Sequence, residues 1–246
     1  MGADIKDGEI GVFFLGQAGF VLKTPDGKTV AVDPYLSDCC NRYFGFKRLM
    51  PYILEPGELN FDYLVCSHAH YDHFDPDSVP ALLASGKTKF IGARDTLAEC
   101  ERLGIKGDLT FLSVGKSVSV GEGRLTAVRC DHGPDTPDAI GLLFEIAGKK
   151  IYMMGDTAYR PEWLTDELIN GVDLLILPIN GAFGNLDSEQ AAKVAKALKP
   201  KLAIPCHFWN FAEHFGSPHE FMARMSDECP DIPFSLMRQG ELLILS

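Results

Sequence analysis

The sequence predicts an α/β protein folded as a four-layer αββα sandwich built from two similar halves. Two observations support this prediction. Short apolar runs alternate along the chain with amphipathic segments, which indicates strands alternating with helices. The same order of elements then occurs twice, and two halves that each carry a sheet and outer helices are expected to pack sheet on sheet.

The first half begins with "GVFFLGQAGFVLKTPDGKTVAVDPY", residues 11–35. It predicts two or three short strands around a turn at residues 25–27, the last strand ending at Asp33. Further along, "PDSVPALLASG" predicts a helix and "TKFIGA" a buried strand. The segment "DTLAECERLG" predicts a second helix with Asp95 as its N-cap and Gly104 at its end.

The second half repeats this order. "GLLFEIAGKKIYMMGDTAY" matches "GFVLKTPDGKTVAVDPY", with Asp156 in the place of Asp33. "VDLLILPINGAFGNLDSEQAAKVAKALKPKLAIPCH" matches "FDYLVCSHAHYDHFDPDSVPALLASGKTKFIGA", with Asp187 in the place of Asp75. A fortuitous match is the alternative, because βα units are common. No linker or shift in composition divides the chain, so residues 1–246 are expected to form a single domain.

Composition narrows the class of protein. The 246 residues are 46% hydrophobic and carry a formal net charge of -11, so nucleic acid is not an expected partner, whereas small anions are compatible. No apolar run is long enough to span a membrane, and the start "MGADIKDGEI" lacks the features of a secretory signal. Seven cysteines without a C-x-x-C pair favour reduced thiols. We therefore expect a cytoplasmic protein with no membrane partner.

The segment "VCSHAHYDHFD", residues 65–75, gathers three histidines and two aspartates directly after an apolar run. Open α/β folds place ligands where a strand ends and a loop begins. Because side chains two apart share a face in extended backbone, His68 and His70 can converge on one ion, while Asp72 and His73 can serve a second centre. Neutral imidazoles and carboxylates suit Zn, Mn or Fe. The alternative is a solvated histidine loop, which protonation would destabilise.

Three further candidates stand at strand ends later in the chain: His132 in "RCDHGPDTPDAIG", Asp156 in "YMMGDTAY" and His207 in "LAIPCHFWN". Each alone could cap a turn. Together with the loop cluster, they indicate a complete metal centre.

These residues resemble a known family. H-A-H-Y-D-H matches the H-x-H-x-D-H signature of the metallo-β-lactamase fold superfamily, and the three later residues match its remaining ligands in order and setting. Finer features resemble the L-ascorbate-6-phosphate lactonase branch: "VDPYLSD", "GFKRLMPYILEPGEL", "GKKIYMMGDTAY", "DLLILPIN" and "IPCHFWNF". The likeness covers nearly the whole chain, and the superfamily's αββα sandwich agrees with the repeat described above.

The resemblance implies two divalent metal ions per chain, Mn or Zn, with Fe also compatible with these ligands. His68, His70 and His132 would hold one ion, Asp72, His73 and His207 the other, and Asp156 would bridge them. Asp72 and Asp156 are the expected catalytic carboxylates, acting with a metal-bound hydroxide that attacks a lactone carbonyl. No protein nucleophile is required, and the sequence contains no G-x-S-x-G segment.

Candidate substrate contacts are Arg160, Asn180, Trp209, Asn210 and His214. Arg160 is the candidate for a phosphate contact, and the aromatic segment after His207 is the candidate for a pocket wall. For that segment the alternative is a packed final loop. The basic loop at residues 42–48 either closes over an anion or is a solvated face.

Two kinds of residue near the ligands have an open role. Asp33 either orients a ligating imidazole or forms a turn before Pro34. Cys66, Cys130 and Cys206 lie close to ligand histidines but are expected to be small core residues rather than ligands.

The leading functional prediction is a metal-dependent hydrolase similar to the ascorbate-6-phosphate lactonases. It would open a phosphorylated sugar lactone, which makes a small anionic carbohydrate-like molecule its expected partner. A homo-oligomer is compatible with the sequence. One alternative is a phosphodiesterase of the ribonuclease Z-like kind, against which the lack of a basic arm argues. The other is a non-catalytic, metal-stabilised binding protein, against which the complete ligand set argues.

Overall fold

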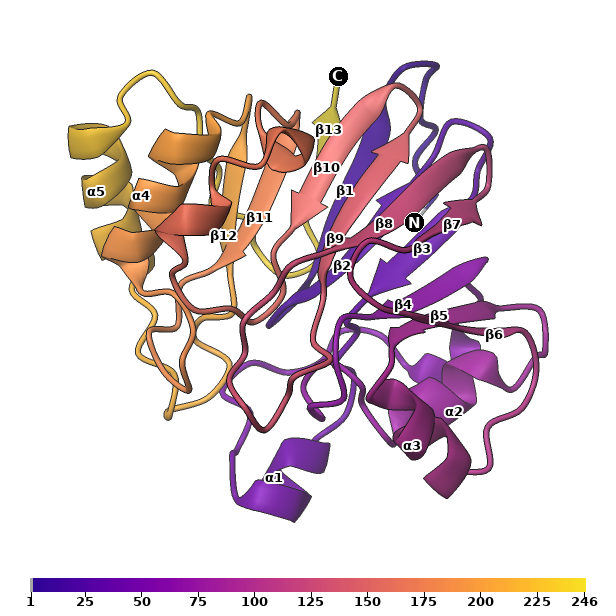
Figure 1. Ribbon diagram of the computed structural model, residues 1–246. Coiled ribbons are helices and arrows are strands. Elements are labelled where there is room, and N and C mark those ends of the chain that lie inside the picture. Colours follow the sequence, from indigo (N-terminus) through magenta and orange to yellow (C-terminus); the bar gives the residue numbers. More distant parts are fainter. Residues whose placement is uncertain (1) are drawn as a thin grey trace.

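The computed structural model describes residues 2–246 and contains two sheets enclosed by helices (Figure 1). The seven-stranded sheet has the order β13 (Leu242–Leu245), β1 (Ile10–Gly16), β2 (Gly19–Lys23), β3 (Thr29–Val32), β4 (Tyr63–Cys66), β5 (Lys89–Ala93), β6 (Leu109–Leu112). The six-stranded sheet has the order β12 (Ala203–Cys206), β11 (Leu174–Pro178), β10 (Lys149–Met153), β9 (Gly141–Ile146), β8 (Gly123–Val128), β7 (Ser117–Val120).

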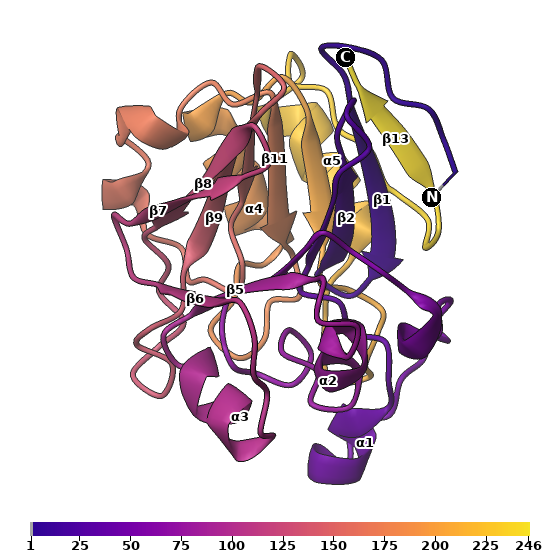
Figure 2. The same cartoon turned by 90° about the vertical axis from the view of Figure 1, so that its right-hand side faces the viewer.

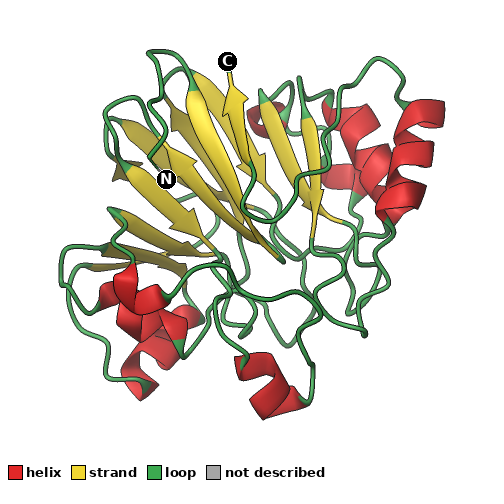
Figure 3. Cartoon of the chain, turned by 180° about the vertical axis from the view of Figure 1, so that it is seen from behind, coloured by secondary structure: helices red, strands yellow, loops and turns green. Residues whose placement is uncertain are grey.

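The helices are α1 (Cys39–Phe44), α2 (Ser78–Leu83), α3 (Thr96–Arg102), α4 (Ser188–Leu198) and α5 (Pro218–Glu228), with short 3-10 turns at Pro56–Glu58, Pro161–Trp163 and Glu167–Ile169. Figure 3 shows α2 and α3 on one side of the strands and α4 and α5 on the other, while α1 lies apart below the sheets. The β13 strand pairs antiparallel with β1 and brings the end of the chain beside its beginning (Figure 2).

The pairing of the strands shows the internal repeat. In the first sheet β2 pairs antiparallel with β3, and β3, β4 and β5 then run parallel. In the second sheet β9 pairs antiparallel with β10, and β10, β11 and β12 run parallel. The helices α2 and α4 occupy the same place in the two halves, between the second and third parallel strands. The predicted four-layer sandwich of two similar halves is confirmed.

Three apolar clusters hold the layers together. Between the sheets, Phe20 and Val65 of one sheet pack with Phe144 and Ile176 of the other, all at most 2% exposed. The other two clusters lie between each sheet and its own helices. Along β11 the side chains alternate between the inner cluster and the α4 side, so both faces are buried. This explains why the sequence "LLILP" is an unbroken apolar run.

The helices α3 and α4 each begin after an aspartate, and the two aspartates make different contacts. At α4, Asp187 accepts a hydrogen bond from the backbone N–H of Gln190 at 2.8 Å and forms a capping box with that residue. At α3, the predicted N-cap Asp95 holds the cap position, but its carboxylate makes no cap hydrogen bond. It accepts instead from the N–H of Ala69 at 3.1 Å, in the loop after β4. Asp95 therefore ties the helix to that loop.

The strand directions place the candidate site. Each of β1, β3, β4 and β5 in one sheet, and each of β8, β10, β11 and β12 in the other, runs in the same direction as the others of its sheet. Their carboxyl ends therefore meet at one edge, where the connecting loops gather (Figure 1). Along the described chain, no helix has the length and apolar character needed to cross a membrane.

The apolar cluster between the two sheets is expected to contribute strongly to the free energy of unfolding. Phe144 is fully buried between the sheets, so Phe144→Ala should lower the free energy of unfolding by about 3–5 kcal/mol, through lost contacts and a cavity. Phe215 is 76% exposed, and Phe215→Ala should change it by no more than about 0.5 kcal/mol. Urea denaturation of both variants measures the difference. Equal effects would contradict this assignment of the core.

Candidate metal centre

The loop after β4 carries four of the candidate ligands and is held in shape by its own hydrogen bonds. The backbone N–H groups of His73 and Phe74 both donate to the carbonyl of His70, at 2.9 and 2.7 Å, which closes a tight turn. Phe74 is fully buried. Asp75 is also fully buried and accepts a hydrogen bond from the hydroxyl of Ser78 at 2.6 Å. The end of the loop is thus anchored in the core.

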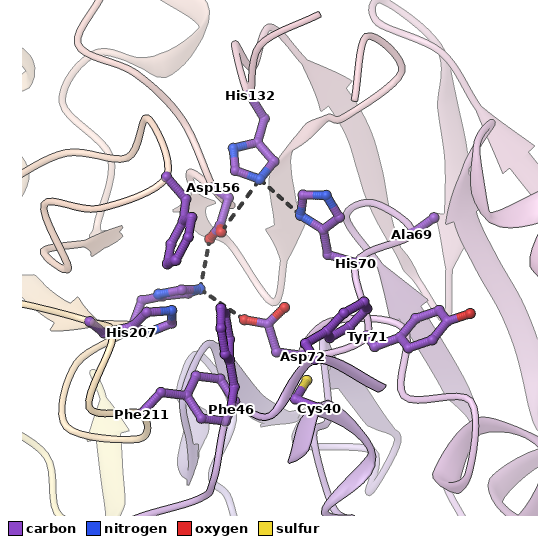
Figure 4. A pocket seen from close by; sticks show the side chains of 13 residues that line it. Cys40, Phe46, Ala69, His70, Tyr71, Asp72, His132, Asp156, His207 and Phe211 are labelled. Atoms are coloured by element: carbon purple, nitrogen blue, oxygen red, sulfur yellow. Dashed lines mark hydrogen bonds and ion pairs between the residues drawn. The ribbon is translucent and has the colours of Figure 1, made fainter. Parts of the chain in front are cut away.

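The structure brings the seven sequence-predicted ligands together. Three imidazoles have ligand atoms within 4.8 Å of one another, and so do a second group of one carboxylate and two imidazoles. The first group is His68, His70 and His132; the second is Asp72, His73 and His207. Asp156 groups with His68 and His73, which places it between the two sets. In Figure 4, His132 and His70 face each other across the site, with Asp156 and His207 beside them.

Distances inside the cluster show why it attracts positive charge. His132 Nε2 lies 3.0 Å from His70 Nδ1, and His73 Nε2 lies 3.2 Å from His207 Nε2. Two imidazole nitrogens that face each other with lone pairs repel unless a proton or a cation lies between them. His68 Nε2 is buried without a hydrogen-bond partner among the described residues, which is costly unless a ligand binds it. These residues therefore fit bound metal cations.

Asp33 orients two of the imidazoles. Its Oδ2 lies 2.8 Å from His73 Nδ1 and accepts a hydrogen bond from the Ser67 hydroxyl at 2.6 Å. That hydroxyl lies 3.1 Å from His68 Nδ1. With a proton on Nδ1 of both rings, each Nε2 keeps its lone pair for a metal. Asp33 also has the left-handed φ of 45° in the turn before Pro34, so both roles considered for it from the sequence are present.

Charge is distributed unevenly over the cluster. Burial by itself would lower the pKa of His73, but the carboxylates of Asp156, Asp72 and Asp33 raise it well above its usual value. In the same way, burial opposes the rise in the pKa of His207 to about 9, which Asp156 and Asp72 cause. These carboxylates attract positive charge to their end of the site, either as protons on the two imidazoles or as a cation.

The imidazole end has the opposite character. Burial lowers the pKa of His68 well below its usual value, and the neighbouring His73 lowers it further. Burial also lowers the pKa of His132, against the pull of Asp156. Both rings are therefore neutral at pH 7 and keep the lone pairs that a metal needs.

A cavity of about 460 Å³ opens above the cluster. Its floor carries five of the candidate ligands, His70, Asp72, His132, Asp156 and His207. The rest of the lining is largely aromatic and comprises Cys40, Phe44, Phe46, Ala69, Tyr71, Phe183, Phe211 and His214. The His214 ring stacks on the His207 ring with their centres 4.6 Å apart. The candidate ligands are thus accessible to a small molecule through an apolar vestibule.

Of the five predicted substrate contacts, the structure brings only His214 into the lining of this cavity. Asn180 and Asn210 are fully buried, and Asn180 Nδ2 donates to the Ala182 carbonyl at 3.3 Å. Trp209 is 58% exposed on the surface. Arg160 is paired with Asp131. Both side-chain amide atoms of Asn210 are buried without a hydrogen-bond partner among the described residues. None of these four residues lines the cavity.

The basic loop at residues 42–48 contributes aromatic rings rather than charge. Arg42 forms an ion pair with Asp77 at 2.6 Å. Arg48 points inward and donates to the carbonyls of Tyr35 and Ser37, at 2.8 and 3.0 Å. The cavity lining receives Phe44 and Phe46 from this segment. The signal in the sequence was "YFGF", which the basic residues around it obscured.

Two polar residues of the site were not predicted from the sequence. Asn185 Nδ2 donates to Asp156 Oδ2 at 2.7 Å, and Gln17 Nε2 donates to Asp72 Oδ2 at 2.8 Å. Gln17 follows β1 just as Asp33 follows β3, so a polar residue at a strand end was an available signal. By contrast, all seven cysteines are free, and no group of candidate ligands found in residues 2–246 includes one.

Comparison with known sequences identifies the family. The family described as "Beta-lactamase superfamily domain" matches residues 11–207, which is most of the chain. The protein belongs to this superfamily. The match spans β1 to the end of β12 and includes all seven candidate ligands.

Individual relatives and a solved structure are similar to this chain over nearly its whole length. A UPF0173 metal-dependent hydrolase of Polynucleobacter asymbioticus is 27% identical over 254 residues, covering 95% of this chain and 86% of the relative. Another, of Thermococcus onnurineus, is 29% identical over 242 residues, covering 95% and 99%. The metallo-β-lactamase fold protein YhfI of Bacillus subtilis superposes with a TM-score of 0.74 at 16% identity, covering 97% and 100%. The chain is a metal-dependent hydrolase of the metallo-β-lactamase superfamily; the lactonase branch stays a prediction.

Removing one candidate ligand from the site tests the metal assignment. Asp156→Asn takes a charge from the position between the two groups, and His70→Ala takes one imidazole from the first. Each should reduce bound metal, measured by elemental analysis, and abolish hydrolysis. Asp173→Asn is the matched control, because Asp173 precedes β11 at the opposite edge of the sheet and pairs with Lys201. Full metal content and activity in either site variant would refute the assignment.

The orienting role of Asp33 has its own test. In Asp33→Asn, an amide oxygen that accepts from the Ser67 N–H leaves an amide N–H facing His73 Nδ1. This arrangement favours the tautomer of His73 that carries its proton on Nε2. The proton then occupies the nitrogen whose lone pair is needed to bind a metal. Metal affinity should fall by about 10- to 100-fold, as measured by competition with a chelator. Wild-type affinity in this variant would show that Asp33 only shapes the turn.

Proposed function

We propose that the protein hydrolyses a carboxylic ester or lactone of a small molecule that carries an apolar group. One observation supports this most strongly: the candidate metal ligands form the floor of a cavity whose wall is aromatic. The ligand set implies hydrolysis, and the wall implies the kind of group beside the bond that is cleaved. Small-molecule sites are usually apolar pockets with a few polar groups that fix orientation.

Under this proposal His68, His70 and His132 hold one divalent cation, Asp72, His73 and His207 hold the other, and Asp156 lies between them. When bound, such a pair supplies Lewis acidity for the substrate carbonyl and lowers the pKa of water. Asp72 lines the cavity, where its carboxylate can accept a proton from the attacking water. Asn185 holds Asp156 in place through its hydrogen bond of 2.7 Å.

The aromatic wall provides the binding surface for the rest of the substrate. The Phe46 ring lies 5.7 Å from Phe183 and 5.9 Å from Phe211, centre to centre, and the Phe44 ring lies 5.5 Å from Tyr71. Rings at these separations pack against one another and leave their remaining faces to the cavity. Burying apolar surface of a substrate against them contributes roughly 25 cal/mol per Å².

The charge of the wall bears on the predicted substrate. Within residues 2–246, no lysine or arginine lines the cavity, and Arg160, the candidate phosphate contact, is engaged by Asp131. A phosphorylated sugar lactone, which the resemblance implies, would find no side-chain cation along the wall. The expected substrate therefore has a lactone or ester bond beside an apolar group in place of a phosphorylated sugar.

A substrate panel tests the proposal. After chelation the protein should lose hydrolase activity and recover it with Mn²⁺ or Zn²⁺. The reloaded protein should turn over aryl esters and aryl-substituted lactones with a higher kcat/KM than a sugar lactone, phosphorylated or not. Turnover of bis-p-nitrophenyl phosphate alone would favour the phosphodiesterase alternative. A fully loaded protein that hydrolyses nothing in the panel would favour the binding protein.

The aromatic wall supplies the matched control for this panel. Phe183→Ala removes one ring from the lining and should raise KM for the aryl substrates by roughly tenfold, with kcat and metal content little changed. Phe215→Ala removes a ring that is 76% exposed and lies outside the lining, so its KM should stay at the wild-type value. Equal KM values in the two variants would show that the aromatic wall does not bind the substrate.

A further inference from the structure

Gln17 lies in the turn between β1 and β2, against one of the candidate ligands. It is 1% exposed and has a φ of 55°, which a residue with a side chain seldom adopts. Its carbonyl accepts a hydrogen bond from the backbone N–H of His207 at 2.8 Å, and His207 itself has a φ of 62°. Two hydrogen-bonded residues that both have a left-handed backbone at a candidate site indicate that the positions of their side chains are important for function.

The Gln17 amide reaches the carboxylate end of the cluster. Its Nε2 lies 2.8 Å from Asp72 Oδ2 and 3.1 Å from His207 Nε2. Its Oε1 is buried and has no hydrogen-bond partner within the described chain. A buried amide oxygen without a partner is destabilising, so this carbonyl oxygen is expected to have a ligand.

The spacing of these atoms matches a coordination sphere. Donors bound to one cation at about 2.0–2.2 Å stand about 3 Å apart, which is the spacing between the end of the Gln17 amide and its two neighbours. An amide N–H in that place would point at a cation, and His207 Nε2, once bound to the cation, would no longer accept it. Turning the amide over exchanges nitrogen and oxygen within nearly the same volume.

We propose that Gln17 Oε1 is an additional ligand of the cation held by Asp72, His73 and His207. The two cations then have unequal surroundings. One has mainly imidazole nitrogens, and the other has an added amide oxygen, a donor that favours ions such as Mn²⁺. This inference rests on the metal centre described above and is independent of the substrate.

Two variants of nearly equal shape separate ligation from hydrogen bonding. Gln17→Leu removes both polar atoms, whereas Gln17→Glu keeps an oxygen donor but loses the N–H that donates to Asp72. If Gln17 is a ligand, Gln17→Leu should weaken binding of the cation held by Asp72, His73 and His207 by at least about tenfold. Gln17→Glu should bind this cation as the wild type does. The readouts are metal stoichiometry, competition with a chelator, and the visible spectrum of the Co²⁺-loaded protein, which reports coordination number.

Gln239→Leu is the matched control. Gln239 Nε2 donates to the carbonyls of Leu15 and Pro51, at 2.9 and 2.7 Å, and does not belong to the cluster. This variant should bind both ions as the wild type does. Weak binding in Gln17→Leu and Gln17→Glu alike would assign Gln17 to positioning Asp72 and overturn the proposal, as would an unchanged Co²⁺ spectrum in Gln17→Leu. A wild-type chain that binds no ion would instead refute the metal centre itself.

Discussion

The crowding of imidazoles and carboxylates at one edge of the sandwich is the constraint on which the rest of this protein depends. Ring nitrogens face each other at 3.0 and 3.2 Å, and several of their neighbours are buried polar atoms without partners. Such an arrangement is stable only with positive charge among the groups. The loop after β4, the orienting carboxylate of Asp33 and the apolar cavity all serve this cluster.

The internal repeat explains how one fold supplies such different groups. Equivalent strand ends carry Asp33 after β3 and Asp156 after β10. Asp33 lies behind the cluster and is hydrogen-bonded to His73 Nδ1. Asp156 lies within the cluster, 3.2 Å from His73 Nε2. The same divergence separates Asp75, which anchors a loop, from Asp187, which caps α4. Equivalent positions in the two halves thus hold a candidate ligand, a residue that supports the ligands, a loop anchor and a helix cap.

The cavity beside the candidate ligands bears on which molecules can reach them. Hydrolysis follows from the family, whereas under the proposed function the walls of the cavity would set the selectivity. The aromatic lining comes from α1 and the loop after it, and from the loops after β4, β11 and β12. These segments are distant in sequence, and rings such as Phe44 and Phe183 remain 57% and 58% exposed at the mouth. Such rings are more readily explained by a bound apolar group than by packing alone.

The sequence by itself predicted many of the strands and helices, the repeat and the positions of the candidate ligands, because each leaves a local trace. Alternating apolar runs, an aspartate after a strand and the H-x-H-x-D-H spacing are all visible in one dimension. Only the tertiary structure decided which residues share the cavity. Arg160 stands four residues after Asp156 yet pairs with Asp131. Gln17 follows a strand and Phe46 lies in "YFGF", but these local signals do not say where the side chains go, and both residues reach the site because their loops converge there. A side chain's neighbours across the fold are fixed by packing between distant segments, and no local pattern records that.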